Sequence, residues 1–373
     1  MLSMSVLSIF LSQMRLWLLA FLLCCLQGRA QNQLEVGLGR GFLIPHRAVM
    51  QHLQQGHSTK ISLSYTKDQS SSDWGSKFNK PTTGVSLHFL SLGNNKELGH
   101  AIGVQYQFAC NLGKRKSALR YTLGAGLGLL TKRYGVDNEK NIAIGSRLNS
   151  SIFMELSKFW ELGKYQLGTG LAINHFSNAS FSTPNLGINI PSINLYFSRS
   201  PQSYARPNST DRTSLIIQNP AELELSLDFG LRQVSVVDDN RYVASSLVLR
   251  YSLASKRISQ LDLFLLQGLN QGIPASIENE VDVTTGQRPT VAASAAYQSG
   301  IGLGYRINFG NTKVFIQQGY YLYSKQPGIG NLFHRVGVNQ KISKKVNLNI
   351  TLRSHFAKAE YLGFGFGYNF LAS

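Results

Sequence analysis

The sequence has little cysteine and no long apolar run beyond its N-terminus. Of its three cysteines, Cys24 and Cys25 lie in an apolar N-terminal segment. Once that segment is removed, Cys110 stands alone and no intramolecular disulfide can form. After residue 30, no apolar stretch approaches the roughly 20 residues that a membrane-spanning helix needs. A helical membrane protein is therefore excluded, which leaves a β-barrel or a secreted β-protein.

Acidic residues are also scarce, with 19 Asp and Glu against 37 Lys and Arg and a net charge of +18. Removing Arg15 and Arg29 with the N-terminal segment leaves +16. A basic excess favours an anionic partner. With no nucleic-acid-binding module in the sequence, lipid phosphate is the better candidate. Scattered solvation of loops is the alternative, because the basic residues form no long run.

The N-terminus has the features of an export signal. Arg15 precedes the apolar run Leu16–Leu26, and small residues follow at Gly28 and Ala30. We predict that residues 1–30 are a signal peptide and that the mature chain begins near Gln31. The sequence before Cys24 lacks the small residue that a lipoprotein signal requires, which argues against a lipid anchor.

Short alternating segments dominate the rest of the chain. Side chains two apart share one face of a strand, and small or polar residues on one face with apolar residues on the other suit a barrel in lipid. We predict an all-β, transmembrane antiparallel β-barrel of about 12–16 strands, with two consecutive eight-stranded barrels as the alternative. The segments are Leu34–Leu43, Lys60–Thr66, Gly84–Ser91, His100–Cys110, Leu119–Lys132, Arg147–Phe159, Tyr165–Ser177, Asn189–Phe197, Glu222–Val237, Tyr242–Ala254, Gln260–Leu269, Ala293–Phe309, Lys313–Tyr323, His334–Ile342, Val346–His355 and Glu360–Phe370.

Composition divides the chain into regions. We predict one β-barrel region over residues 31–199, a loop or linker over 200–220 and a second β-barrel region over 221–373. The polar connection Gln271–Thr290 is expected to be external. The last strand ends in an aromatic stripe that resembles the signal by which the barrel assembly machinery recognises outer-membrane barrels. Its members are Leu362, Phe364, Phe366, Tyr368 and Phe370.

One apolar stripe ends in residues that could carry out chemistry. His175 and Ser177 continue the face of Leu171 and Ile173, and Asn189 begins the next segment in phase with its apolar set. If the two strands are antiparallel neighbours, the end of the first meets the start of the second. The three polar side chains then outline a Ser-His-Asn constellation.

The segments 175–180 (HFSNAS) and 184–189 (PNLGIN) resemble the active-site region of the PagL-type, acyloxyacyl hydrolase-like outer-membrane lipid A 3-O-deacylases. Those enzymes are eight-stranded barrels that remove an ester-linked acyl chain from lipid A. The resemblance covers the N-terminal half of the chain. It implies an outer-membrane location and lipid A or lipopolysaccharide as substrate.

The resemblance also implies roles for individual residues. Ser177 would be the nucleophile and His175 the general base, with the oxyanion held by the amides around Asn178, Ala179 and Ser180. The position of the family's acid is occupied by Asn189. No Asp or Glu occurs between Ser177 and residue 211, so a shift of alignment restores none.

We therefore expect an outer-membrane ester hydrolase without a cofactor and without a nucleic-acid partner. A noncatalytic lipid-binding barrel would explain the missing carboxylate. A porin-like channel would instead depend on inward residues such as Arg120, Arg147 and Arg353. The spacing of His46, His52 and His57 does not place imidazoles on one helix face, so no metal site is predicted.

Overall fold

The fold is described from a computed structural model of the 373-residue chain. The structure describes residues 32–113, 119–199, 219–280, 286–356 and 358–371. The proposed signal peptide and residues 200–218 of the proposed linker lie outside the described residues.

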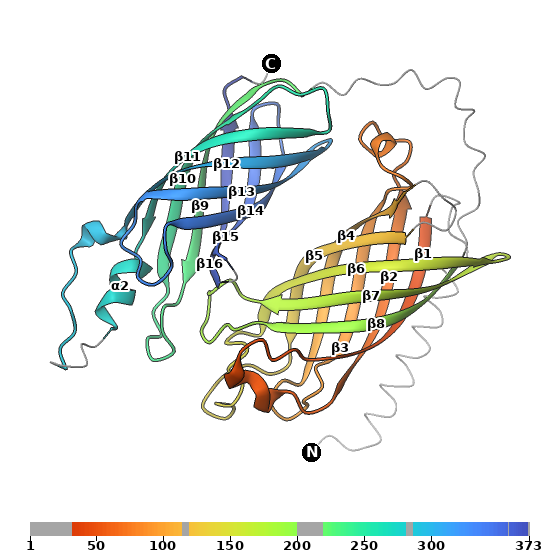
Figure 1. The fold of residues 1–373 in the computed structure, drawn as a ribbon, viewed down its shortest axis with the longest axis horizontal. Helices are drawn as coiled ribbons and strands as arrows, with labels where there is room; N and C mark the ends of the chain where they lie inside the picture. Colours follow the sequence, from red (N-terminus) through yellow and green to blue (C-terminus); the bar gives the residue numbers. More distant parts are fainter. Residues whose placement is uncertain (1–31, 114–118, 200–218, 281–285, 357, 372–373) are drawn as a thin grey trace.

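Sixteen strands form two closed antiparallel barrels of eight strands each (Figure 1). The first contains β1 (Asn32–Phe42), β2 (His57–Asp68), β3 (Thr82–Ser91), β4 (His100–Leu112), β5 (Leu119–Leu130), β6 (Leu148–Leu162), β7 (Tyr165–Ser177) and β8 (Ile188–Arg199). The second contains β9 (Glu222–Arg232), β10 (Tyr242–Ser252), β11 (Ser259–Asn270), β12 (Tyr297–Phe309), β13 (Thr312–Tyr323), β14 (Leu332–Lys341), β15 (Val346–His355) and β16 (Lys358–Asn369).

The predicted all-β barrel fold is confirmed, in the form of the two-barrel alternative. The single barrel of about 12–16 strands that we preferred is not the arrangement found. The reason is long-range pairing: β8 returns to β1, with Leu195 opposite Leu38, and β16 returns to β9, with Phe366 opposite Leu227. Each set of eight strands therefore closes on itself.

The strands place apolar side chains outside and polar side chains inside. On β7 and β8, Leu171 and Leu195 are 66% and 63% exposed, whereas the inward Asn174 and Asn194 are buried. A soluble barrel would reverse this pattern, since its apolar face must avoid water. The arrangement is that of a barrel surrounded by lipid. No helix within the described residues is long and apolar enough to cross a membrane.

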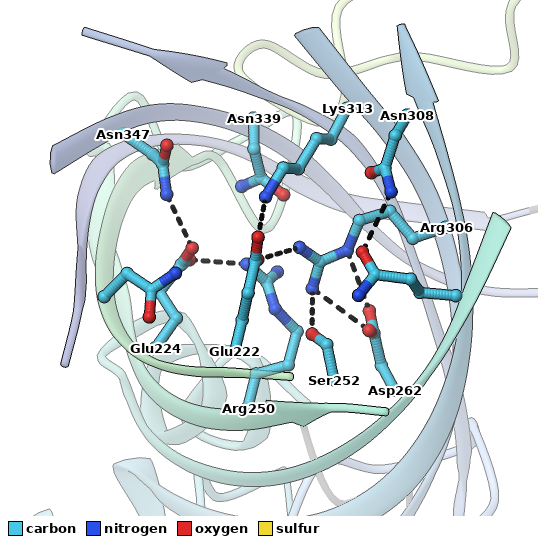
Figure 2. A network of polar contacts seen from close by, with 12 residues as sticks. Glu222, Glu224, Arg250, Ser252, Asp262, Arg306, Asn308, Lys313, Asn339 and Asn347 are labelled. Atoms are coloured by element: carbon cyan, nitrogen blue, oxygen red, sulfur yellow. Dashed lines mark hydrogen bonds and ion pairs between the residues drawn. The ribbon is translucent and has the colours of Figure 1, made fainter. Parts of the chain in front are cut away.

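Both interiors are filled by polar side chains that bind one another. In the second barrel, buried Arg306 contacts Glu222 (2.9 Å) and Asp262 (3.0 Å), and Arg250 contacts Glu224 (2.6 Å), as Figure 2 shows. Charges removed from water need such partners. The interior is thus packed rather than open.

Two of the three arginines suggested for a channel lie in these interiors. Arg120 pairs with Glu35 at 2.9 Å in the first barrel, and Arg353 pairs with Glu360 at 3.2 Å in the second. The expectation for Arg147 was wrong. It precedes β6 and is exposed, because the strand begins only at Leu148 and Arg147 belongs to the preceding loop.

An apolar core closes one end of the first barrel. The short 3-10 helix η1 (Ala48–Leu53) contributes Met50 and Leu53, which pack with the inward side chains Phe176 and Ile188. Phe176 lies between His175 and Ser177 in the sequence, and Ile188 directly precedes Asn189. The core therefore fixes the ends of β7 and β8.

Among the described residues, three further short helices lie in connections: η2 (Gly75–Lys77), α2 (Gly272–Glu278) and η3 (Ala293–Ala296). The sequence predicted no helix within Gln271–Thr290. Buried Ile273 and Ala275 show that α2 packs inward, so this part of the connection is not wholly external.

The two barrels contact each other at both ends. At one end Trp74 and Phe78 of the β2–β3 connection meet Phe309, with ring centroids 5.2 and 5.7 Å apart. At the other end, the loop after β7 reaches the start of β16 (Figure 1). The second contact lies beside the candidate site.

Candidate active site

Strand pairing brings the predicted residues together. His175 on β7 is the direct cross-strand partner of Asn189 on β8. Ser177 lies two residues beyond His175 on the same face, while the intervening Phe176 is buried in the apolar core. The inward anchoring of Phe176 fixes the phase, so His175 and Ser177 must point outward.

The three side chains form a hydrogen-bonded chain. His175 Nδ1 lies 2.7 Å from Asn189 Oδ1, and His175 Nε2 lies 3.0 Å from Ser177 Oγ. An amide oxygen can only accept a hydrogen bond, so His175 Nδ1 carries the proton and donates a hydrogen bond to Asn189 Oδ1. Nε2 is then free to accept from the Ser177 hydroxyl. This is the tautomer that a histidine base requires.

A second histidine, His46, completes the chain, and the sequence prediction missed it. Asn189 Nδ2 donates to His46 Nδ1 at 3.2 Å. This bond fixes which end of the amide faces His175. His46 lies 143 residues away in the β1–β2 connection, where the Ile44 N–H donates to the Asn189 carbonyl (2.9 Å). No local spacing signals it. Only the closure of β1 on β8 brings it there.

Ser150 on β6 holds the backbone of the candidate nucleophile. Its hydroxyl donates to the Ser177 carbonyl at 2.6 Å and lies 3.4 Å from Ser177 Oγ. Ser150 is the cross-strand partner of Ser177. Neighbouring strands on both sides of β7 therefore orient the pair of His175 and Ser177.

The loop after Ser177 contains the residues predicted to form an oxyanion hole. The Asn178 backbone N–H donates to Asn185 Oδ1 (3.0 Å), and its side chain donates to Ser146 Oγ and to the Ser182 carbonyl (2.8 and 2.9 Å). Asn178 thus serves to shape the loop. In the part of the chain that the structure describes, the Ala179 and Ser180 backbone N–H groups donate to no protein acceptor.

Ala179 and Ser180 adopt left-handed backbone conformations, with φ of +51° and +64°. Residues other than glycine avoid this region, at a cost of about 1–3 kcal/mol each. Such conformations persist only where the surroundings enforce them. They turn the chain sharply next to the Ser177 hydroxyl.

The site lies at the end of an apolar outer surface. On the same outward face, the next cross-strand pair beside His175 and Asn189 is Ile173 with Pro191. The pair after that is Leu171 with Ile193, which is 60% exposed. Acyl chains that lie along these strands would end beside Ser177. Among the described residues, no Asp or Glu side chain hydrogen-bonds to His175, and no cluster of His, Cys, Asp and Glu is arranged to hold a metal ion.

Two family models match this chain. Residues 59–198 match the model described as "Lipid A 3-O-deacylase (PagL)", and residues 221–372 match "Acyloxyacyl hydrolase, C-terminal domain". The first match contains Ser177, His175 and Asn189, and the second spans the second barrel. Together the matches span more than half of the chain, and they confirm the resemblance found in the sequence. No curated protein sequence matches the chain.

Solved structures also match parts of the chain. A crystal structure titled as the outer membrane enzyme PagL is 18% identical, covers 44% of this chain and 98% of its own, and has a TM-score of 0.33. A mutant Rhodopseudomonas blastica porin is 10% identical, covers 91% and 100%, and has a TM-score of 0.18.

Proposed function

Because residues 59–198 match the family model of the lipid A 3-O-deacylases (PagL), we propose that this protein is an outer-membrane ester hydrolase that removes an acyl chain from lipid A. The observation that carries the proposal is the hydrogen-bonded chain Ser177–His175–Asn189 at the end of an apolar outer surface. Lipid A and lipopolysaccharide present ester-linked acyl chains and anionic phosphates, which suit that surface and the net charge of +18.

The proposed reaction is acyl transfer to serine followed by hydrolysis. Ser177 Oγ attacks the ester carbonyl carbon while its proton passes to His175 Nε2. The tetrahedral oxyanion accepts hydrogen bonds from the Ala179 and Ser180 amides. Collapse breaks the ester C–O bond, and the sugar hydroxyl leaves with the proton from His175. Water, deprotonated by His175, then releases the fatty acid and restores Ser177.

Asn189 takes the place of an acid in this mechanism. Its amide oxygen orients the imidazole and fixes the Nδ1–H tautomer but adds no charge to stabilise imidazolium. The proposed enzyme therefore keeps the geometric function of the third residue without its electrostatic one. The reaction is therefore expected to be slower with Asn189 than it would be with a carboxylate at this position.

Export and assembly complete the proposal. Residues 1–30 would direct the chain out of the cytoplasm, and the outward aromatic stripe of β16 would be read by the barrel assembly machinery. Phe364 and Phe366 are 56% and 65% exposed on that stripe.

The test is mass spectrometry of lipid A from cells that lack the protein, carry it or carry a variant. The wild-type protein should convert part of the lipid A to a species lighter by one acyl chain. Ser177→Ala and His175→Ala should each abolish the conversion while the barrel still assembles, because both side chains lie on the outer surface. Conversion by either variant at the wild-type level would rule out the assigned pair. Unchanged lipid A in all strains would favour a noncatalytic lipid-binding barrel.

A further inference from the structure

The loop between β7 and β8, residues 178–187, is held by the second barrel as well as by the first. The Gln233 backbone N–H donates to the Ser180 carbonyl at 2.8 Å. Gln233 Oε1 accepts from the Thr183 N–H (2.8 Å) and the Ser182 hydroxyl (3.3 Å). The Ser180 hydroxyl donates to the Ala359 carbonyl at 2.7 Å. Gln233 follows β9 and Ala359 lies on β16, so both partners belong to the second barrel.

These contacts are buried and rigid on the side of the second barrel. Gln233 and Ser182 are only 4% and 5% exposed. The Gln233 amide is fixed in turn, because its Nε2 donates to the Asp238 carbonyl at 2.7 Å. Arg241 covers the neighbouring ring of Phe181, with 5.1 Å between the guanidinium carbon and the ring centroid. Hydrogen bonds shielded from water in this way hold their geometry more strongly than exposed ones.

Ser180 is the residue at which these contacts meet the proposed chemistry. Its carbonyl and its hydroxyl are both bound by the second barrel, and its φ of +64° requires such enforcement. Its N–H and that of Ala179 are the groups assigned to the oxyanion. A loop released from Gln233 and Ala359 would be free to relax away from this conformation.

We propose that the second barrel positions the oxyanion-binding loop of the first, with Gln233 as its principal positioning residue. This inference rests on the proposed hydrolase function. The second barrel then has a role in the reaction through the β7–β8 loop, although its own residues do not contact the reacting atoms. Because stabilisation of the oxyanion acts in the transition state, loss of positioning lowers kcat and leaves KM nearly unchanged.

The test compares Gln233→Ala with Gln233→Glu in the full-length protein, assayed on lipid A in detergent micelles. Both loop contacts of the side chain are accepted by Oε1, which alanine lacks. Burial favours the neutral form of a glutamic acid at this position. Its carbonyl oxygen can accept the same two hydrogen bonds while its hydroxyl donates to the Asp238 carbonyl in place of Nε2. Gln233→Ala should lower kcat by about 10- to 100-fold with KM within about twofold of wild type. Gln233→Glu should recover most of the rate. Should the alanine variant fail to assemble, Gln233→Met keeps the side-chain length without the acceptor.

Tyr242→Phe is the matched control. The Tyr242 hydroxyl donates to Asp238 (2.7 Å) within the same connection of the second barrel, so its loss weakens that connection without removing a contact to residues 180–183. Its kcat should equal that of wild type. An undiminished kcat in Gln233→Ala, or an equal loss in Gln233→Ala and Gln233→Glu, would overturn the proposal.

A second readout separates this inference from the proposed function. A fluorophosphonate probe labels an activated serine whatever the natural substrate. If the wild-type protein is labelled at Ser177, the labelling rate should fall in Gln233→Ala and recover in Gln233→Glu even if lipid A is not the substrate. Wild-type protein that is labelled but inert on lipid A would contradict only the substrate assignment. Equal labelling rates in all variants would contradict only the positioning role.

Discussion

At the scale of single residues, Asn189 decides how the proposed reaction proceeds. Its oxygen accepts from His175 at 2.7 Å, in the position that the family resemblance assigns to an acid. Asn189→Ala should lower activity about 10- to 100-fold by releasing the imidazole. Asn189→Glu should keep or raise activity, because a carboxylate also stabilises imidazolium. Near the membrane interface a new acid costs only about 0–1 kcal/mol. Initial rates of fatty acid release measure both effects.

The rates of the two Asn189 variants show whether this residue orients His175 or takes no part in the site. Equal rates in wild type, Asn189→Ala and Asn189→Glu would show that this residue is not the third member of the site. A lower rate in Asn189→Ala alone supports orientation as its function. The folded barrel in each variant is checked by its altered mobility in unheated gels.

His46 is expected to act through Asn189 rather than on the substrate. Because His46 Nδ1 accepts from Asn189 Nδ2 at 3.2 Å, it keeps the amide oxygen directed at His175. His46→Ala should lower kcat, by less than Asn189→Ala does, and should have no further effect in an Asn189→Ala background. Additive losses in the double variant would assign His46 a separate role. Rates of the two single variants and the double variant complete the cycle.

At the scale of elements, the β7–β8 loop depends on a glycine next to the base. Gly187 has φ +84°, and a Cβ there would lie 3.0 Å from His175 Cε1. Gly187→Ala should displace the imidazole and lower kcat about 10- to 100-fold. Gly163→Ala is the control, since Gly163 also has a left-handed φ (+62°) and open space around it. Both variants carry a backbone cost of about 1–3 kcal/mol, so only contact with His175 separates them. Equal rates in the two would contradict this account.

The strands were the most predictable elements. Alternation alone predicted residues 165–177 as a strand, which are the bounds of β7. It overran β9, predicted to continue to Val237, because the chain leaves the barrel after Arg232 and Gln233 turns to the first barrel instead. The short helices η1 and α2 escaped prediction, since their apolar residues are too few to show a helical period.

Contacts between distant segments could not be predicted in the same way. The phase of two neighbouring strands predicted that His175, Ser177 and Asn189 share a face. By contrast, His46 and Gln233 reach the site through barrel closure and through docking of the second barrel. A single sequence contains no local pattern that predicts barrel closure beside His46 or the docking of the second barrel through Gln233.

At the scale of the whole molecule, the filled interiors oppose a channel function. Arg306 is completely buried among Glu222, Asp262 and Ser252, and Arg353 is buried beside Glu360 (Figure 2 shows the first group). We therefore expect the protein in planar bilayers to show no steady ion conductance. It should fractionate with the outer membrane and shift in gel mobility on heating. Stable channel openings, or recovery as a soluble periplasmic protein, would contradict this picture.

Arg306 also offers a way to unfold one barrel before the other. Arg306→Ala leaves the Asp262 carboxylate buried without its arginine, which should cost about 3–5 kcal/mol, all of it in the second barrel. The first barrel can be followed separately. Its Trp74 and Trp160 are the tryptophans that remain once the proposed signal peptide, with Trp17, is removed. Trp74→Phe would leave Trp160, on β6, as a reporter away from the contact with Phe309.

If the second barrel holds the catalytic loop, activity should be lost when that barrel unfolds. In Arg306→Ala with Trp74→Phe, circular dichroism should show an earlier thermal transition, and the rate of fatty acid release should fall with it. Trp160 fluorescence should still report a folded first barrel at that temperature. Arg120→Ala, which breaks the pair with Glu35 in the first barrel, should instead lower the fluorescence transition. Activity that survives the earlier transition of Arg306→Ala would show that the first barrel needs no support from the second.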